Sequence, residues 1–346
     1  MADVPTPASR LARYRTDYLL MTCAAIALVL LILALTGAAP MGTPLGHAAH
    51  TVHEMLAAMW WGIALAILII GVLERIPQEF IIALLGPPGS RNGVLRAAVA
   101  GVLLDLCSHG ILAVGAKLYQ RGASAGQVMA FLIASPWNSV SLTFILVGLI
   151  GLGWTIAFIG LSLVVAITTG LAFDRLARTG RIPANDAQVD LPVNFRFGPA
   201  SRELVSTIEW EPRLLADIVI NGLRGTRIVL RWLMFGLVVA AALRAFLSPE
   251  DFAQWFGPSL LGLGLTLVGA TIFEVCSEGS VPIAADLMNR AGAPGNSFTF
   301  LLAGVASDYT EIMVLREATG STKIALMLPA ICVPQVLLIG WVLNQL

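Results

Sequence analysis

The stretch "EVCSEGSVPI" (residues 274–283) places two carboxylates, a thiol, a hydroxyl, a glycine and a proline inside a run that is otherwise apolar enough to cross a membrane. Residues 105–114, "DLCSHGILAV", carry the same pattern 169 positions earlier. When residues 105–146 are aligned without gaps to residues 274–315, eleven of 42 positions are identical, including a Cys-Ser-x-Gly and an arginine. Shared apolar composition explains a few matching Leu or Ala residues but not this set at one register, so we infer that the chain contains two copies of one unit.

The composition indicates an integral membrane protein. Of 346 residues, 57% are hydrophobic and 12% are charged, whereas soluble domains carry about 25% charged residues. The apolar runs are about 20 residues long, which suits transmembrane helices and is too long for the strands of a membrane barrel. The net charge of zero gives no basic surface for nucleic acid. The lipid bilayer is therefore the expected partner, and nucleic acid is not.

The apolar runs divide the chain into four parts. We expect residues 1–55 to hold a first span and an outer loop that contains histidines, residues 56–173 a first membrane repeat, residues 174–224 a cytoplasmic linker, and residues 225–346 a second membrane repeat. The first span, 18–38, is too long for the apolar core of a signal peptide. The later spans are expected at 56–73, 126–150, 151–173, 227–246, 298–318 and 324–343, with interrupted stretches at 94–119 and 260–288.

The basic residues predict the orientation. Arg10, Arg13 and Arg15 precede the first span, which places the N-terminus in the cytoplasm. If residues 94–119 dip into the membrane and return, the linker with its seven arginines is also cytoplasmic, and only Arg244 and Arg290 lie outside. The two copies then enter the membrane from opposite sides, as in an inverted-repeat transporter fold with broken or re-entrant helices. A break at residues 135–138 gives the same count, so full crossings stay open.

The two Cys-Ser motifs are expected to form tips that approach each other inside the membrane. The predicted substrate-binding residues of the tips are Cys107, Ser108, His109, Cys276, Ser277 and Glu278, and the adjacent Asp105 and Glu274 are candidates for proton or ion coupling. Thiolate and imidazole suit zinc or copper(I), and thiols suit trivalent arsenic or antimony, so Cys107, His109, Cys276 and Glu278 are candidate metal ligands. The N–H groups at the helix starts after the tips favour an anion instead.

A second polar set follows each tip. It comprises Asn138 and Ser139 in "ASPWNSVS" and Ser307, Asp308 and Glu311 in "AGVASDYTE". We expect Asn138, Ser139 and Ser307 to line the same cavity as the tips. Asp308 and Glu311 share a helix face if the helix continues, and they are the preferred candidates for proton or cation coupling. The alternative is a structural role, in which these side chains satisfy broken backbone.

Three histidines lie in "GHAAHTVHE", on the predicted outer side. His47, His50 and His53 are spaced so that neighbours could share a metal ion or sense pH. The alternative is a set of interfacial histidines with no ligand. Cys23 and Cys332, in plain apolar runs, are expected to be packing residues.

At these motifs the chain resembles the predicted permease family that includes the organoarsenical exporters and the YraQ-type membrane proteins. The matching pieces are "CSHG", "AFLIASPWN", "CSEGSVPI" and "TFLLAGVASD", and the resemblance covers residues 56–343. In the arsenical exporters, cysteines of a Cys-Ser-Cys type motif are implicated in recognising trivalent organoarsenicals, which by resemblance implicates Cys107 and Cys276. His109 replaces the second cysteine, which favours a mixed site for a borderline metal.

The sequence therefore predicts a secondary permease for a soft or borderline metal or metalloid, in a bacterial-type inner (plasma) membrane. A proton-coupled transporter of a small organic anion and a membrane metal-binding or assembly protein are the alternatives. The chain has no H-E-x-x-H, G-x-S-x-G or phosphate-binding loop motif, so an enzyme is not expected. No cofactor is required, a transition metal enters as substrate, and a homo-oligomer stays open.

Overall fold

The computed structural model describes residues 17–40, 42–104, 108–134, 140–188, 212–245, 255–272 and 277–346, together with Gly198 and Arg202. Within these residues all regular structure is helical. Four segments of this part are long and apolar enough to cross a membrane: Tyr18–Thr36, Leu152–Arg178, Pro294–Thr319 and Thr322–Leu343. The prediction of an all-α integral membrane protein is confirmed.

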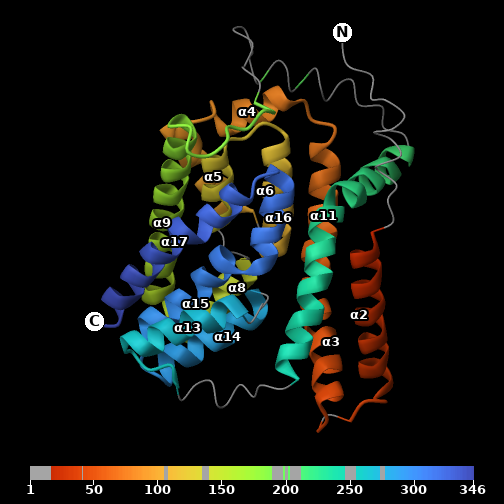
Figure 1. The fold of residues 1–346 in the computed structure, drawn as a ribbon, viewed down its shortest axis with the longest axis vertical. Helices are drawn as coiled ribbons and strands as arrows, with labels where there is room; N and C mark the ends of the chain where they lie inside the picture. Colours follow the sequence, from red (N-terminus) through yellow and green to blue (C-terminus); the bar gives the residue numbers. More distant parts are fainter. Residues whose placement is uncertain are drawn as a thin grey trace.

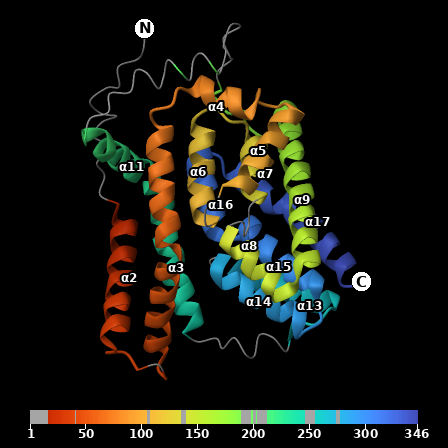
Figure 2. The ribbon, with the colours of Figure 1, turned by 180° about the vertical axis from the view of Figure 1, so that it is seen from behind.

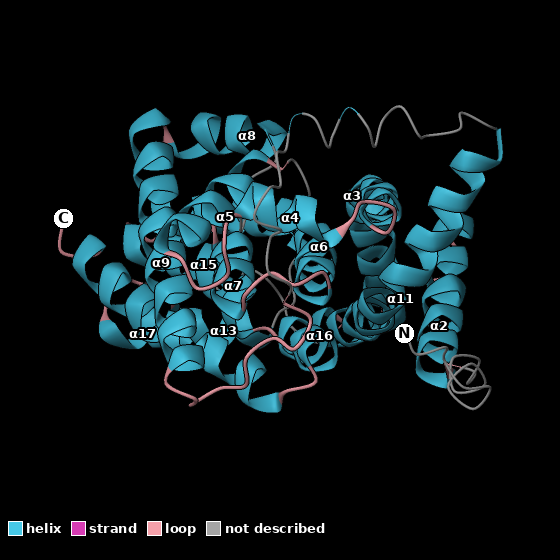
Figure 3. Cartoon of the chain, turned by 90° about the horizontal axis from the view of Figure 1, so that it is seen from above, coloured by secondary structure: helices cyan, strands magenta, loops and turns pink. Residues whose placement is uncertain are grey.

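Three helices stand beside the rest of the molecule. They are α2 (Tyr18–Thr36), α3 (Pro44–Leu73) and α11 (Pro212–Arg244), which lie side by side in Figures 1 and 3. We call them the three-helix unit. They have an apolar core of their own, formed by Ala27, Ala48, Val52, Met55, Leu233, Leu237 and Ala241. A Cβ on Gly71 of α3 would lie 2.0 Å from the carbonyl oxygen of Ile218 in α11, so this glycine lets the two backbones touch, as small residues do in membrane helix pairs.

The remaining helices form two sets with matching order, which we call the repeat bundle. The first set is α5 (Arg91–Leu103), α6 (Ser108–Gln120), α7 (Ala125–Ile133), α8 (Val140–Ile150) and α9 (Leu152–Arg178). The second set is α13 (Leu260–Ile272), α14 (Ser277–Asn289), α15 (Pro294–Ser307), α16 (Tyr309–Thr319) and α17 (Thr322–Leu343). The bounds of α5, α6 and α8 recur in α13, α14 and α16 at a displacement of 169 residues, the displacement of the sequence alignment. A short helix, α4 (Gln78–Leu85), joins α3 to the first set.

The two sets also repeat a buried hydrogen-bonding device. Gln127 of α7 donates its side-chain amide to the carbonyl oxygens of Leu85 and Gly86, at 3.3 and 3.0 Å. Asn296 of α15, 169 positions later, donates to Phe256 and Gly257, both at 3.0 Å. In each set the third helix is thereby tied to the chain segment that precedes the first helix.

A second shared device is a close glycine contact between the third and the last helix of each set. Gly126 of α7 lies against Gly170 of α9, and Gly295 of α15 lies against Gly340 of α17. A Cβ on Gly295 would lie 1.7 Å from the carbonyl oxygen of Gly340. Since that neighbour is backbone, it cannot move aside without displacing a helix.

We therefore expect Gly295→Ala to lower the free energy of unfolding by about 3 kcal/mol or more, because the two helices must separate. The matched control is Gly304→Ala in the same helix, where the nearest atom to a new Cβ lies at 3.7 Å. The control should be neutral or slightly stabilising, since alanine favours helix by about 1 kcal/mol. Thermal unfolding in detergent measures both, and equal melting temperatures for the two variants would contradict the packing argument.

Two of the predicted spans correspond to longer helices. The helix predicted at 227–246 begins at Pro212, and proline is well suited to a first helical turn because its missing N–H has no partner there. The helix predicted at 151–173 continues to Arg178. Residues 179–188 of the predicted linker fold back on the bundle, because Asn185 donates its side-chain amide to the carbonyl oxygens of Tyr119 and Ala123 at 2.6 and 2.8 Å.

Ion pairs join the three-helix unit to the repeat bundle. Glu74, directly after α3, pairs with Lys117 and with Arg121 of the α6 end, and Arg121 also donates to the carbonyl oxygen of Ile76 at 2.9 Å. Burial alone would raise the pKa of Glu74, but the hydrogen bond from Lys117 and the charges of Lys117 and Arg121 outweigh it and hold the pKa below its usual value. The Glu74 carboxylate is therefore more stable in the folded chain than in the unfolded chain.

A second group of ion pairs lies on α11. Arg231 contacts Asp17, directly before α2, and Glu317 of α16, both at 2.6 Å. Trp232 donates its indole N–H to the same Glu317 at 2.9 Å. Arg231 therefore connects α2, α11 and α16.

Glu74→Gln is expected to lower the free energy of unfolding at pH 7 by about 1–3 kcal/mol, the typical contribution of hydrogen bonds to a charged group. Because the folded pKa is depressed, this stability is present above the unfolded glutamate pKa of about 4.3 and disappears as pH falls through the folded value. Melting curves from pH 7 to pH 3 should converge for wild type and variant. Glu79→Gln, at a glutamate that makes no ion pair within the described residues, is the control.

Candidate functional site

Six of the predicted site residues lie outside the described residues: Asp105, Cys107, Asn138, Ser139, Glu274 and Cys276. Ser277 and Glu278 begin α14, and their side chains also lie outside the described part. Within the described part, no three His, Cys, Asp or Glu side chains are placed to hold one metal ion. The thiol-containing metal site stays a prediction.

The first tip leads directly into a helix. Ser108 is the first residue of α6, and His109, the second, is 3% exposed. His109 as a substrate or metal ligand stays a prediction, which rests on its place next to Cys107 in the sequence.

The polar segment of the second repeat interrupts a membrane-spanning segment. Residues 294–319, which together are long enough to cross, form two helices because Asp308 adopts an extended backbone between α15 and α16. Its carboxylate caps α16 by accepting a hydrogen bond from the backbone N–H of Thr310 at 2.9 Å. Asp308 and Glu311 were expected to share a helix face only if the helix continues, and that condition is not met, since the helix starts again after Asp308.

Two substitutions of Asp308 separate the contribution of its capping oxygen from that of its charge. Asp308→Ala should cost about 1 kcal/mol of unfolding free energy, because the N–H groups of the first turn of α16 lose their acceptor. Asp308→Asn keeps a capping oxygen and should retain nearly all of the stability. Thermal unfolding of both variants provides the measurement. An equal loss in both would mean that the charge, and not the cap, stabilises the break.

Buried polar side chains surround the break. Asp308 and Glu311 are 5% and 4% exposed. The Ser307 hydroxyl lies 2.7 Å from that of Thr271 on α13, and the buried Thr310 hydroxyl has no hydrogen-bond partner among the described residues. Sequence reasoning missed Thr271, because a single threonine in an apolar helix usually bonds its own backbone. It does that here as well, to Leu267 at 2.9 Å.

The helices next to the predicted site pack against helices of the other repeat. The helix that follows the first tip, α6, packs against α16, which follows the break of the second repeat. In the same way α14 packs against α8. At the far ends of this second pair, Asn289 donates its side-chain amide to the carbonyl oxygen of Leu149 at 3.0 Å, so α14 and α8 run in the same direction. The first tip therefore leads into the helix next to Asp308 and Glu311.

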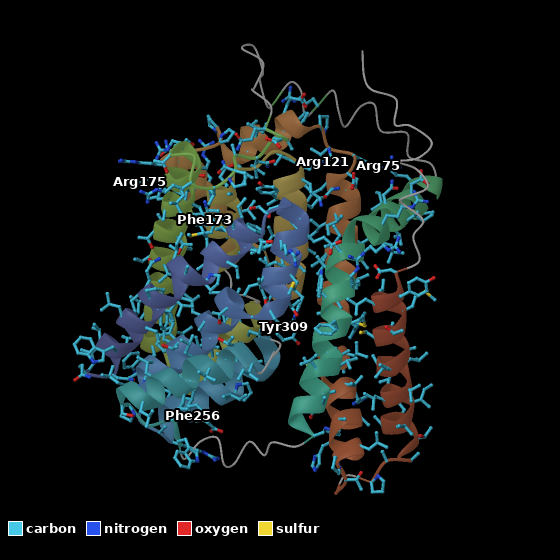
Figure 4. The ribbon with its side chains drawn as sticks, in the orientation of Figure 1. Arg75, Arg121, Phe173, Arg175, Phe256 and Tyr309 are labelled. Atoms are coloured by element: carbon cyan, nitrogen blue, oxygen red, sulfur yellow. The ribbon has the colours of Figure 1, made fainter. Side chains whose placement is uncertain are left out.

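In Figures 1 and 2 α6 and α16 lie in the upper half of the bundle, and α8 and α14 lie in the lower half. Figure 4 places Tyr309, the first residue of α16, at mid-depth and Arg121, just beyond α6, at one end of the molecule. The first turn of a helix carries backbone N–H groups without intrahelical partners and a partial positive charge. The buried first turns of α6 and α16 therefore provide N–H donors to the interior of the bundle.

The α16 helix is attached to α11 at both ends. The Tyr309 hydroxyl donates to the carbonyl oxygen of Gly236 at 3.2 Å, and the rings of Tyr309 and Phe235 meet edge to face with centroids 5.9 Å apart. Near its other end, Glu317 binds Arg231. Any movement of the three-helix unit therefore acts directly on the helix that carries Glu311.

His47, His50 and His53 lie in the helix α3 and not in a loop. The predicted helix start at residue 56 is wrong, because α3 begins at Pro44 with Thr43 as its cap. His50 Nδ1 lies 3.3 Å from the Glu54 carboxylate, one turn later on the same helix. A metal at His47, His50 and His53 stays a prediction.

A sequence model of the family described as "Predicted permease" matches residues 44–345, which start with α3 and leave α2 outside. A UPF0718 protein of Methanocaldococcus jannaschii is 26% identical over 305 residues, covering 73% of this chain and 82% of the relative. The UPF0718 protein YcgR of Bacillus subtilis is 22% identical over 274 residues, covering 78% of this chain and 88% of the relative. No solved structure matches the chain.

Proposed function

The chain belongs to this predicted permease family, and on that premise we propose that it is a secondary transporter of a soft or borderline metal or metalloid species. The observation that carries the proposal is that helices of the two repeats pack against each other at the predicted site. The helix after the first Cys-Ser motif, α6, packs against α16 of the second repeat, and the helix after the second motif, α14, packs against α8 of the first repeat. Transporters of this class bind their substrate where discontinuous helices of two repeats meet at the membrane midplane.

The two repeats are inverted in this proposal. In Figure 1 α5 and α6 occupy the upper half of the bundle, whereas α13 and α14 occupy the lower half, which supports opposite entry sides. Arg75, Arg121 and Arg175 lie at the upper end and Phe256 at the lower end (Figure 4). Because basic residues favour the cytoplasmic side, the upper end is assigned to the cytoplasm. The Cys-Ser motifs then form re-entrant tips.

The substrate site combines both tips with the break. Cys107, His109 and Cys276 supply soft and borderline ligands, and Glu278 supplies an oxygen. Ser307 lines the cavity, and Asp308 and Glu311 carry the coupling proton or cation. Buried carboxyls in a membrane protein exchange protons when their charge is costly, and both of these side chains are buried.

The decisive experiment uses proteoliposomes loaded with zinc, copper(I) or arsenite. Cys107→Ala and Cys276→Ala are each expected to lower the initial flux of the transported species at least tenfold, because a thiolate ligand is lost. Cys332→Ala, at a buried packing cysteine of α17, is the matched control and should retain transport. Wild-type flux in both tip variants would remove the thiols from the mechanism.

One observation favours a second candidate, a transporter of a small organic anion. The first turns of α6 and α16 are buried in the bundle, and such helix starts bind anions readily. Thermal-shift measurements of the purified protein against metal ions and against small carboxylates separate the two candidates. Stabilisation by the carboxylates alone would replace the metal substrate with an anion.

A membrane protein that holds a metal without moving it is distinguished by counterflow. A transporter exchanges labelled external substrate for unlabelled internal substrate, whereas a scaffold or an enzyme does not. Absence of counterflow with every substrate that binds would overturn the transport proposal.

A further inference from the structure

Asp174 is a buried acid that the proposed mechanism does not use. It lies near the end of α9, between Phe173 and Arg175, which Figure 4 labels, and it is 3% exposed. Its Oδ1 accepts a hydrogen bond from the backbone N–H of Gly126, at the start of α7, at 3.1 Å. Among the described residues Oδ2 has neither a donor nor an acceptor within hydrogen-bond distance. One half of the carboxyl is therefore buried without a hydrogen bond.

The second repeat has an amide at the corresponding place. Gly295 is the equivalent of Gly126, and its backbone N–H donates to Oδ1 of Asn344, just beyond α17, at 2.7 Å. The other end of that amide donates to Oδ1 of Asn296 at 2.8 Å. Asn344 thus performs the same capping task without a charge and uses both of its polar atoms. An amide has the shape of a protonated carboxyl, with a donor in place of the O–H group.

The surroundings of Asp174 leave little room to compensate a charge. A Cβ on Gly126 would lie 2.3 Å from Asp174 Oδ1 and 2.3 Å from the carbonyl oxygen of Gly170, so the helices touch at this point. An ionised carboxylate that is buried and unpaired costs several kcal/mol. The partial positive charge at the start of α7 favours the ionised form of Asp174, but it acts on only one of the two carboxyl oxygens. In the second repeat, the corresponding helix start of α15 binds a neutral amide, that of Asn344.

No described cation forms an ion pair with Asp174. On α9 the nearest is Arg178, an exposed residue whose Nε–H donates to the backbone carbonyl oxygen of Asp174 at 3.3 Å. The helices packed against α9 carry few other charged side chains, namely Arg91 and Arg96 on α5 and Lys323 at the start of α17, and α7 and α8 carry none. Arg175 lies on α9 itself, and Arg181 and Asp186 follow it. The Ser124 hydroxyl and the charge of Arg178 also lie near the carboxyl and favour its ionised form.

From this geometry we propose that Asp174 is a proton-binding site of the first repeat, and that its carboxyl is protonated when α7 and α9 are packed as they are here. Loss of the proton places a buried charge, without an ion pair among the described residues, in the glycine contact between the two helices and weakens that contact. Since α7 ends at Ile133, just before the polar segment 135–139, proton release also acts on the substrate site. That last link rests on the proposed function, whereas proton binding does not.

The test uses the difference between the two repeats. Because the folded chain holds a proton that the unfolded chain releases above pH about 4, the folding equilibrium constant of wild type should fall about tenfold per pH unit until Asp174 ionises in the folded state. Asp174→Asn should remove this part of the pH dependence. Asn344→Asp should add a second contribution of the same sign. Thermal unfolding in detergent between pH 5 and pH 8 measures all three proteins.

Infrared spectroscopy gives an independent reading. The wild-type protein at pH 6 should show a carboxylic acid C=O band that Asp174→Asn lacks. The proposal fails if that band is absent from wild type, or if wild type and Asp174→Asn have the same pH dependence. If Asp174→Asn does not fold, Asn344→Asp decides. An unchanged pH dependence of Asn344→Asp would show that the corresponding helix contact of the second repeat tolerates a charge, and the proposal would fail. Neither the thermal unfolding nor the infrared measurement requires the substrate, so the result of each is independent of the transport assays.

Discussion

A helix that is interrupted inside a membrane leaves backbone N–H and C=O groups that lipid cannot satisfy. In this protein the interruption between α15 and α16 is enclosed by other helices, and Asp308 supplies the acceptor for the restarted helix. The arrangement of the repeat bundle follows from this constraint. The broken segment must be surrounded by protein, so the helices after the tips pack against the helices after the breaks of the other repeat.

The enclosure depends on very close helix contacts. Glycine pairs bring α7 onto α9 and α15 onto α17, and a side-chain amide anchors the third helix of each repeat to the segment before the first. Both devices occur at corresponding positions, which indicates that the two repeats keep one internal architecture. Where they differ is in charge, since Asp174 stands in the first repeat and Asn344 in the second.

The connections to the three-helix unit are less symmetric. Glu74, Arg231 and Glu317 form ion pairs that hold α6 and α16 to that unit. At a displacement of 169 residues their equivalents are Leu243, Gly62 and Gly148, which cannot form such pairs. Within the described residues these ion pairs therefore have no counterpart at the equivalent positions of the other repeat.

By itself the sequence determined the class of the protein and its internal duplication, because apolar length and a register of matching residues are local properties of a chain. It also marked the polar segment around Asp308. It misplaced the starts of α3 and α11 at residues 56 and 227, since apolar content falls toward those ends while the helices continue to Pro44 and Pro212. Only the tertiary structure decided that the helix stops at Asp308, that α6 lies beside α16, and that Asp174 meets Gly126. Each of these depends on which distant backbone approaches closely enough to supply a hydrogen bond or to exclude water, and no spacing along the chain specifies that.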